Sequence, residues 1–94
     1  MEDVEFDPMK DAENQGKHGL PLNLAPLIFE GPFIEEEDRR HNYEETRIVA
    51  TGPIELFDGR ICVVVYTWRD GVRRIISFRK ANDKEVRQYQ ASVD

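Results

Sequence analysis

Apolar positions change their spacing near residue 45, and the change separates a helical half of the chain from a strand-rich half. Before that point apolar residues recur at helical intervals, and after it they alternate with polar residues as in half-buried strands. A last helical pattern follows the strands. Because this order contains no β-α-β alternation, we predict an α+β fold with the helices packed on one face of a small, mainly antiparallel sheet.

Two helices are predicted in the first half, after a short extended segment at residues 4–6. Asp7-Pro8 supplies an N-cap followed by proline at the first helical position, and Gly19 is a typical C-terminal residue. The first helix should therefore span residues 8–18. A shorter helix is expected over residues 22–30.

Strands and one more helix are predicted in the second half. Residues 46–51 and 54–57 form two strands separated by a break at Gly52-Pro53, and Asp70-Gly71 is a strong signal for a hairpin over residues 61–79. Asn82 and Glu85 have the spacing of a capping box, which opens a last helix to about residue 91 with Val86 and Tyr89 on its inner face. The acidic segment from 33 to 45 is predicted to be a solvated connection.

Composition favours one small domain covering residues 1–94. No apolar stretch approaches the roughly 20 residues that cross a bilayer, and the acidic start Met1-Glu2-Asp3 is unlike a signal peptide, so we expect a cytoplasmic protein with no membrane partner. Cys62 is the single cysteine and is expected to be buried. Together with His18 and His41, which is expected to be exposed, it lacks the spacing of a ligand set, so we predict neither a metal site nor a cofactor.

Charge is distributed unevenly around the net value of -6. Residues 1–45 hold thirteen acidic residues and four Lys or Arg, whereas residues 46–94 hold six acidic residues and nine Lys or Arg. The excess of acid disfavours a general nucleic-acid binder, because such binding depends on neutralising phosphates. The basic second half nevertheless indicates a localised anion-binding surface on the hairpin.

A two-residue loop at Asp70-Gly71 would give the hairpin two different faces. The more apolar face, expected to meet the helices, pairs Arg69 with Val72, Thr67 with Arg74, Val65 with Ile76 and Val63 with Phe78. The other face pairs Trp68 with Arg73, Tyr66 with Ile75, Val64 with Ser77 and Cys62 with Arg79. Because arginine binds phosphate and aromatic rings stack on bases, the second face is a candidate nucleic-acid surface. Solvated arginines beside a tryptophan that covers the turn are the plainer interpretation.

Residues along nearly the whole chain also carry a family resemblance. They are Phe6-Asp7-Pro8, Lys10, Asn14, Lys17-His18-Gly19, Phe29, Asp38, Glu45, Arg47, Val63-Val64-Val65-Tyr66-Thr67, Arg69, Arg74-Ile75-Ile76-Ser77, Arg79-Lys80-Ala81, Glu85 and Tyr89. In this order they resemble the BrnT family of ribonuclease toxins. The segment from Asp7-Pro8 through Lys17-His18-Gly19 and the segment from Arg74 through Ala81 are the most specific parts of the match.

The resemblance implies a RelE-like fold and a metal-independent endoribonuclease that cleaves RNA and inhibits translation. It implies a bacterial type II toxin-antitoxin system in which a BrnA-type ribbon-helix-helix antitoxin neutralises the toxin and alone contacts DNA. Phe6, Thr46 and Phe78 depart from the family pattern. An alternative is therefore a catalytically inactive relative that acts as a protein-binding module with a DNA-binding antitoxin.

Cleavage requires a proton carrier and cations that stabilise the phosphorane, and the hypothesis assigns these catalytic roles to Lys17, His18, Arg74 and Arg79. Substrate binding is assigned to Arg47, Tyr66, Trp68 and Arg73. Structural interpretations remain open for these residues. Arg74 could be a cation at the sheet rim, and Lys17 and His18 could be cations that stabilise a helix C-terminus. Arg47 could pair with the acidic segment, and Tyr66 could belong to the edge of the core. Ideal alternation puts Arg74 and Arg79 on opposite faces, so both can serve only if the strand contains a bulge or ends early.

Overall fold

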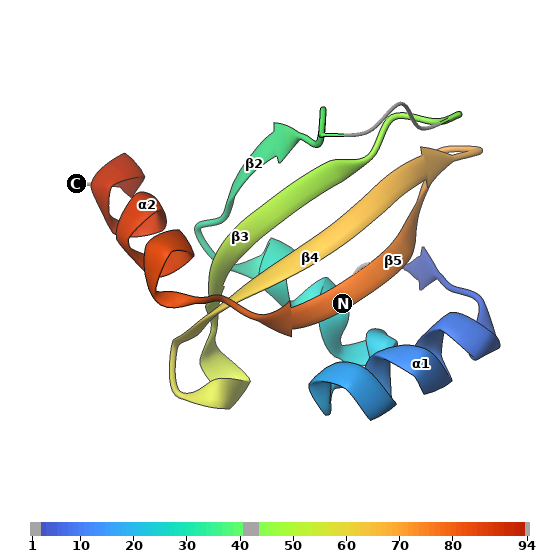
Figure 1. Cartoon of the computed structure of the whole chain (residues 1–94), viewed down its shortest axis with the longest axis horizontal. Coiled ribbons are helices and arrows are strands. Elements are labelled where there is room, and N and C mark those ends of the chain that lie inside the picture. The colour runs from blue at the N-terminus through green and yellow to red at the C-terminus, as the bar shows by residue number, and fades with distance from the viewer. Residues whose placement is uncertain (1–2, 41–43, 94) are drawn as a thin grey trace.

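The computed structural model describes residues 3–40 and 44–93 and contains a five-stranded sheet with the spatial order β1-β5-β4-β3-β2 (Figure 1). His41, predicted to be exposed, lies outside the described residues. The elements in chain order are β1 Val4–Glu5, α1 Pro8–His18, the 3-10 helix η1 Leu22–Glu30, β2 Ile34–Glu37, β3 Ile48–Ile54, the 3-10 turn η2 Glu55–Phe57, β4 Arg60–Arg69, β5 Val72–Lys80 and α2 Asp83–Val93. Among the strands of the described residues, only β1 and β5 pair in parallel. The predicted α+β class with a mainly antiparallel sheet is confirmed.

The core lies between η1 and one face of the sheet. From the sheet it takes a row of buried side chains that includes Val64, Tyr66 and Phe78, and from η1 it takes Leu22 and Ile28. Cys62 is buried in the same cluster, as predicted, and burial raises the pKa of its thiol. Within the described residues no helix is long and apolar enough to cross a membrane.

Helix α2 packs on the opposite face, which corrects the expectation that all helices share one face. Val49 and Thr51 of β3 point away from the core and line a groove together with Tyr89 of α2. The buried Tyr89 donates its hydroxyl hydrogen to the Pro32 carbonyl oxygen. In Figure 1, α2 lies at the end of the molecule away from α1. Helix α2 is therefore held against the β2–β3 side of the sheet.

Local signals in the sequence are confirmed where they concern caps and turns. Asp7 accepts a hydrogen bond from the Met9 amide at 2.8 Å, and Gly19 ends α1 with φ +72°. The Asp70-Gly71 turn has positive φ at both residues, as a type I′ hairpin requires. Asn82 and Glu85 form the reciprocal capping box, with both bonds at 2.9 Å.

Two segments differ from prediction. The acidic residues 34–37 form strand β2 at the sheet edge, because alternate side chains of an edge strand face solvent and tolerate charge. The expected break at Gly52-Pro53 lies inside β3, and the residues after it form η2 where a strand was expected. A β-carbon at Gly52 would lie 3.0 Å from two atoms of Phe33. Gly52 thus permits Phe33 to approach the backbone of β3 closely, and the strand continues through Gly52 to Ile54.

The β4–β5 register contains a bulge that changes the predicted faces. Val65 pairs with Ser77 and Tyr66 pairs with Ile75, so Ile76 has no partner on β4. Beyond the bulge, β5 is shifted by one residue relative to the prediction. The face of Tyr66 meets η1, and the face assignments of the hairpin were therefore inverted.

Asn14 joins α1 to the edge of β5 immediately after the bulge. Its buried amide donates to the carbonyl oxygens of Phe78 at 2.7 Å and Leu20 at 2.8 Å, and its oxygen accepts from the Phe78 amide at 3.0 Å. Because the described part of β1 pairs with β5 at residues 73 and 74 and not beyond the bulge, this side chain takes the place of a neighbouring strand there.

Replacing Asn14 by alanine should lower the free energy of unfolding by about 2–4 kcal/mol, since both backbone groups of Phe78 lose their partner. Urea denaturation followed by Trp68 fluorescence measures the effect. The matched control is Gln15→Ala, which removes one exposed bond to Asp11 and should cost less than about 0.5 kcal/mol. Equal stability of the two variants would contradict the role given to Asn14.

The Arg79–Glu85 pair should make stability depend on pH below the ordinary carboxyl value of 4.5, because the bond to Arg79 lowers the pKa of Glu85. A lowered carboxyl pKa contributes stability above 4.5 that is lost as pH falls through the folded-state value. Glu85→Gln should therefore destabilise by about 1 kcal/mol at pH 7 and by progressively less in acid. Urea midpoints at several pH values test this, with exposed Glu13→Gln as control; a difference independent of pH would contradict it.

Candidate functional site

The bulge at Ile76 places Arg74 and Arg79 on one face of the sheet. Arg74 pairs with Thr67 and Arg79 pairs with Val63, and both partners point away from the core. A bulge or an early strand end was predicted from the sequence to be necessary for Arg74 and Arg79 to act on one face. That bulge is present. This face, opposite η1, is where the candidate site lies.

Arg74 and Arg47 line one small hollow on this face. Its volume is about 110 Å³, and its lining residues are Asp7, Lys10, Glu45, Arg47, Arg74, Ile75 and Ile76. The buried Thr67 lies in the strand next to Arg74, and its hydroxyl donates to the Thr46 carbonyl oxygen at 2.7 Å, which holds the start of β3 beside β4. Three cationic side chains thus border a single anion-sized space.

Carboxylates accompany these cations. Glu5 of β1 lies 3.8 Å from the Arg74 guanidinium, and Glu45 lies 3.6 Å from that of Arg69. Both contacts are long and partly exposed, so each is weak. A bound phosphate could therefore compete for Arg74, while Glu45 supplies a carboxylate at the same hollow.

Arg79 is held differently. Its two terminal nitrogens donate to the two carboxylate oxygens of Glu85 at 2.7 and 2.8 Å, and its side chain is 33% exposed. The hydrogen bond with Glu85 raises the pKa of Arg79, so it stays cationic. A bidentate pair of this kind is the geometry in which arginine would otherwise bind phosphate.

Lys17 and His18 occupy the last turn of α1, and His18 lies close enough to Arg79 to be affected by its charge. Burial lowers the pKa of the half-buried His18 below its ordinary value of 6.5, and the charges of Arg79 and Lys17 lower it further. His18 is therefore neutral at pH 7 and can accept a proton. Lys17 is exposed.

The predicted cations lie at two positions along β5. Arg74 lines the same hollow as Arg47, whereas Arg79 lies close enough to His18 for its charge to lower the pKa of the imidazole. Five residues of strand span on the order of 15 Å between Arg74 and Arg79. That separation suits contacts with different phosphates of one strand.

The three remaining candidates form an aromatic cluster on the core face. Tyr66 is fully buried, donates to Glu35 at 2.7 Å, and has its pKa raised first by burial. The Arg73 guanidinium carbon lies 3.9 Å from the ring centroid of Phe29 and 4.6 Å from that of Trp68. Trp68 is 50% exposed, so it alone of the two predicted aromatic residues offers an open ring face.

Sequence reasoning gave no role to Lys10, and it weighed Glu45 as a base but favoured a solvated carboxylate; both residues line the hollow with the two arginines. Their presence among the residues of the family resemblance was the available signal. In the described part of the chain no group of three or more His, Cys, Asp and Glu residues could hold a metal ion.

Comparison with known proteins assigns the family. The family model described as "Ribonuclease toxin, BrnT, of type II toxin-antitoxin system" matches residues 6–85. A search of curated proteins finds no match. The crystal structure of the Brucella abortus ribonuclease toxin BrnT superposes with a TM-score of 0.62 at 19% identity, covering 88% of this chain and 100% of that chain, which shows a shared fold. Because the family model covers most of the sequence, the chain belongs to the BrnT family of ribonuclease toxins of type II toxin-antitoxin systems.

Proposed function

We propose that this chain is a toxin endoribonuclease that cleaves RNA, thereby inhibits translation, and is neutralised by a BrnA-type ribbon-helix-helix antitoxin. The observation that carries the proposal is the hollow in which Arg47 and Arg74 lie beside Lys10 and Glu45. Family membership supplies the reaction class, and this hollow offers the charges that the reaction needs.

RNA carries its own nucleophile. The 2′-oxygen attacks phosphorus, its proton passes to a base, and the 5′-oxygen departs with a proton, leaving a 2′,3′-cyclic phosphate and a 5′-hydroxyl. Negative charge on the phosphorane oxygens is the main quantity to stabilise, and preorganised guanidinium groups do this without a metal. In the proposal Arg47 and Arg74 provide that stabilisation.

Glu45 is the proposed base, because a carboxylate at the hollow can take the 2′-hydroxyl proton. Lys10 is the third cation and the proposed donor to the leaving oxygen. Lys17, His18 and Arg79 are proposed to contact another phosphate of the same RNA strand, since Arg79 lies farther along β5 and His18 lies near it. This assignment moves Lys17, His18 and Arg79 from catalysis to binding.

Trp68 is the proposed stacking surface for a base, because half of its surface is open. Arg73 lies against its ring, and Tyr66 packs edge-on to it with a centroid separation of 5.7 Å. These two residues are proposed to support the orientation of Trp68 and not to contact RNA directly. A sequence-tolerant contribution to affinity is expected.

One observation favours the alternative, a catalytically inactive protein-binding module. Arg79 is occupied by Glu85, and the acidic strand β2 lies on the same sheet. Such a protein would bind its antitoxin without cleaving RNA. The two functions differ in one measurable property, RNA cleavage by the isolated wild-type chain.

Arg74→Ala and Arg47→Ala should each slow RNA cleavage by about 10²–10³-fold, because each removes a charge that stabilises the phosphorane. Cleavage of end-labelled RNA by purified protein in EDTA, resolved on denaturing gels, measures the rate. Arg60→Ala is the matched control, since Arg60 is an exposed arginine at the far end of β4. Intact RNA with wild-type protein, together with unarrested growth on induction, would favour the inactive module.

Glu45→Gln should reduce the cleavage rate by about 10²–10³-fold, whereas His18→Gln should reduce it only a few-fold and leave the pH profile unchanged. If His18 were the base, the wild-type rate would rise through a pH below 6.5, because its pKa is lowered, and His18→Gln would abolish that rise. Single-turnover rates between pH 5 and 8 decide between the two bases.

A further inference from the structure

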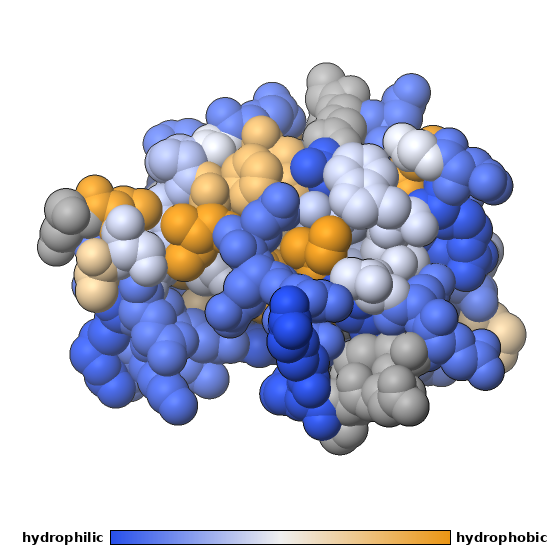
Figure 2. All heavy atoms as spheres, turned by 90° about the horizontal axis from the view of Figure 1, so that it is seen from above, coloured by the Kyte–Doolittle hydropathy of each residue, from blue (hydrophilic) through white to orange (hydrophobic). Residues whose placement is uncertain are grey.

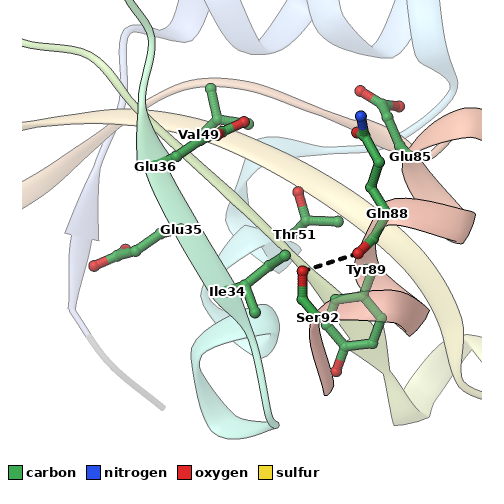
Figure 3. Close-up of a pocket in the computed structure, with 9 residues that line it drawn as sticks. All are labelled: Ile34, Glu35, Glu36, Val49, Thr51, Glu85, Gln88, Tyr89 and Ser92. Carbon is green, nitrogen blue, oxygen red and sulfur yellow. Dashed lines mark hydrogen bonds between the residues drawn. The ribbon is translucent and has the colours of Figure 1, made fainter. Parts of the chain in front are cut away.

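A second hollow separates α2 from the β2–β3 side of the sheet (Figure 3). Its volume is about 350 Å³, and Ile34, Val49 and Thr51 line it from the sheet. Helix α2 contributes Tyr89, Gln88, Ser92 and Glu85. Ile34, Val49 and Thr51 are only half-buried, so apolar surface remains open between a helix and an edge strand. We call this hollow the α2 groove.

Carboxylates line the α2 groove, among them Glu36 from β2 and Glu85 from α2. Glu85 is already paired with Arg79, so of these two Glu36 is the one whose charge is open to a partner, and the lining residues that the structure describes include no lysine or arginine. In Figure 3 Glu35 points away from the other side chains, and its carboxylate instead accepts the Tyr66 hydroxyl bond on the core face. Phosphate groups would be repelled here, so the α2 groove is unsuited to RNA.

The α2 groove opens at the border of the sheet. Strand β2 pairs only with β3, which leaves its other edge free within the described residues. Figure 2, which looks at the molecule from the side of β2, shows apolar surface broken up by hydrophilic side chains. An acidic edge strand alone would only discourage sheet-to-sheet association, but an apolar floor beside it provides a place for inserted side chains.

We propose that the α2 groove is a docking surface for a cationic, amphipathic segment of the protein antitoxin; the choice of partner rests on the proposed function. Apolar side chains of the segment contact Ile34 and Val49, and a lysine or arginine of the segment faces Glu36. Complementary charge would give this segment specificity and fast association. RNA and antitoxin then use different surfaces of one sheet.

Titration of the ¹⁵N-labelled full chain with two synthetic peptides tests the inference. The peptides share one leucine pattern, and lysine in the first is replaced by glutamate in the second. The lysine peptide should shift the amide resonances of β2, β3 and α2, and the glutamate peptide should not bind. Shifts centred on the Arg47–Arg74 hollow or on α1 would overturn the proposal.

Substitutions at two exposed positions in different elements distinguish specific binding in the α2 groove from general attraction to an acidic protein. Glu36→Lys on β2 and Ser92→Lys on α2 should each weaken binding of the lysine peptide at least about fivefold. Glu13→Lys is the matched control on α1 and should leave the dissociation constant nearly unchanged. Equal weakening by Glu13→Lys and Glu36→Lys would reduce the effect to net charge and overturn the proposal.

RNA cleavage by the same variants keeps the two proposals distinguishable. Glu36→Lys and Ser92→Lys should cleave RNA at the wild-type rate, because neither residue lines the Arg47–Arg74 hollow. Groove binding without any cleavage by wild-type protein would contradict the proposed enzyme and support the docking surface. RNA cleavage without peptide binding in the groove would support the proposed enzyme and contradict the docking surface. Displacement of the lysine peptide by single-stranded RNA would assign the α2 groove to RNA and overturn the proposal that it binds the antitoxin.

Discussion

One constraint governs strand β5: it must turn Phe78 towards the core and direct both Arg74 and Arg79 away from it. Regular alternation cannot meet this requirement, because residues 74 and 78 would share a face. The unpaired Ile76 resolves the conflict by shifting the phase of the strand. Asn14 then bonds both backbone groups of Phe78. Core packing, the position of α1 and the direction of two arginines therefore depend on one inserted residue.

Charged side chains gather at two places on the face that the bulge creates. Arg47 and Arg74 border a hollow near β1, and Glu36 and Glu85 line the groove beside α2. Charges of the other sign lie close by in both places, because Asp7 and Glu45 also line the hollow and Arg79 pairs with Glu85. Salt screening confines the effect of each charge to roughly 8–10 Å at ordinary ionic strength, so recognition at either place depends on single side chains and not on the net sign of a region.

Arginine beside aromatic residues has two physical outcomes, and only packing decides between them. The sequence interpretation treated Trp68, Tyr66 and Arg73 as an open surface for RNA. In the fold, the Arg73 guanidinium lies over three rings, which satisfies its charge through cation–π contact at the edge of the core. Arginine and aromatic side chains, which can bind the phosphates and bases of RNA, thus also bind each other.

The sequence by itself determined the features set by neighbouring residues: the α1 caps, the Asp70-Gly71 turn and the Asn82–Glu85 capping box, because each depends on backbone groups a few positions away. The family could be recognised for the same reason, from short local segments. Only the tertiary structure decided the phase of β5, the strand formed by residues 34–37 and the meeting of Arg47 with Arg74. Those features follow from pairing and packing between distant segments, whose energies no local pattern contains.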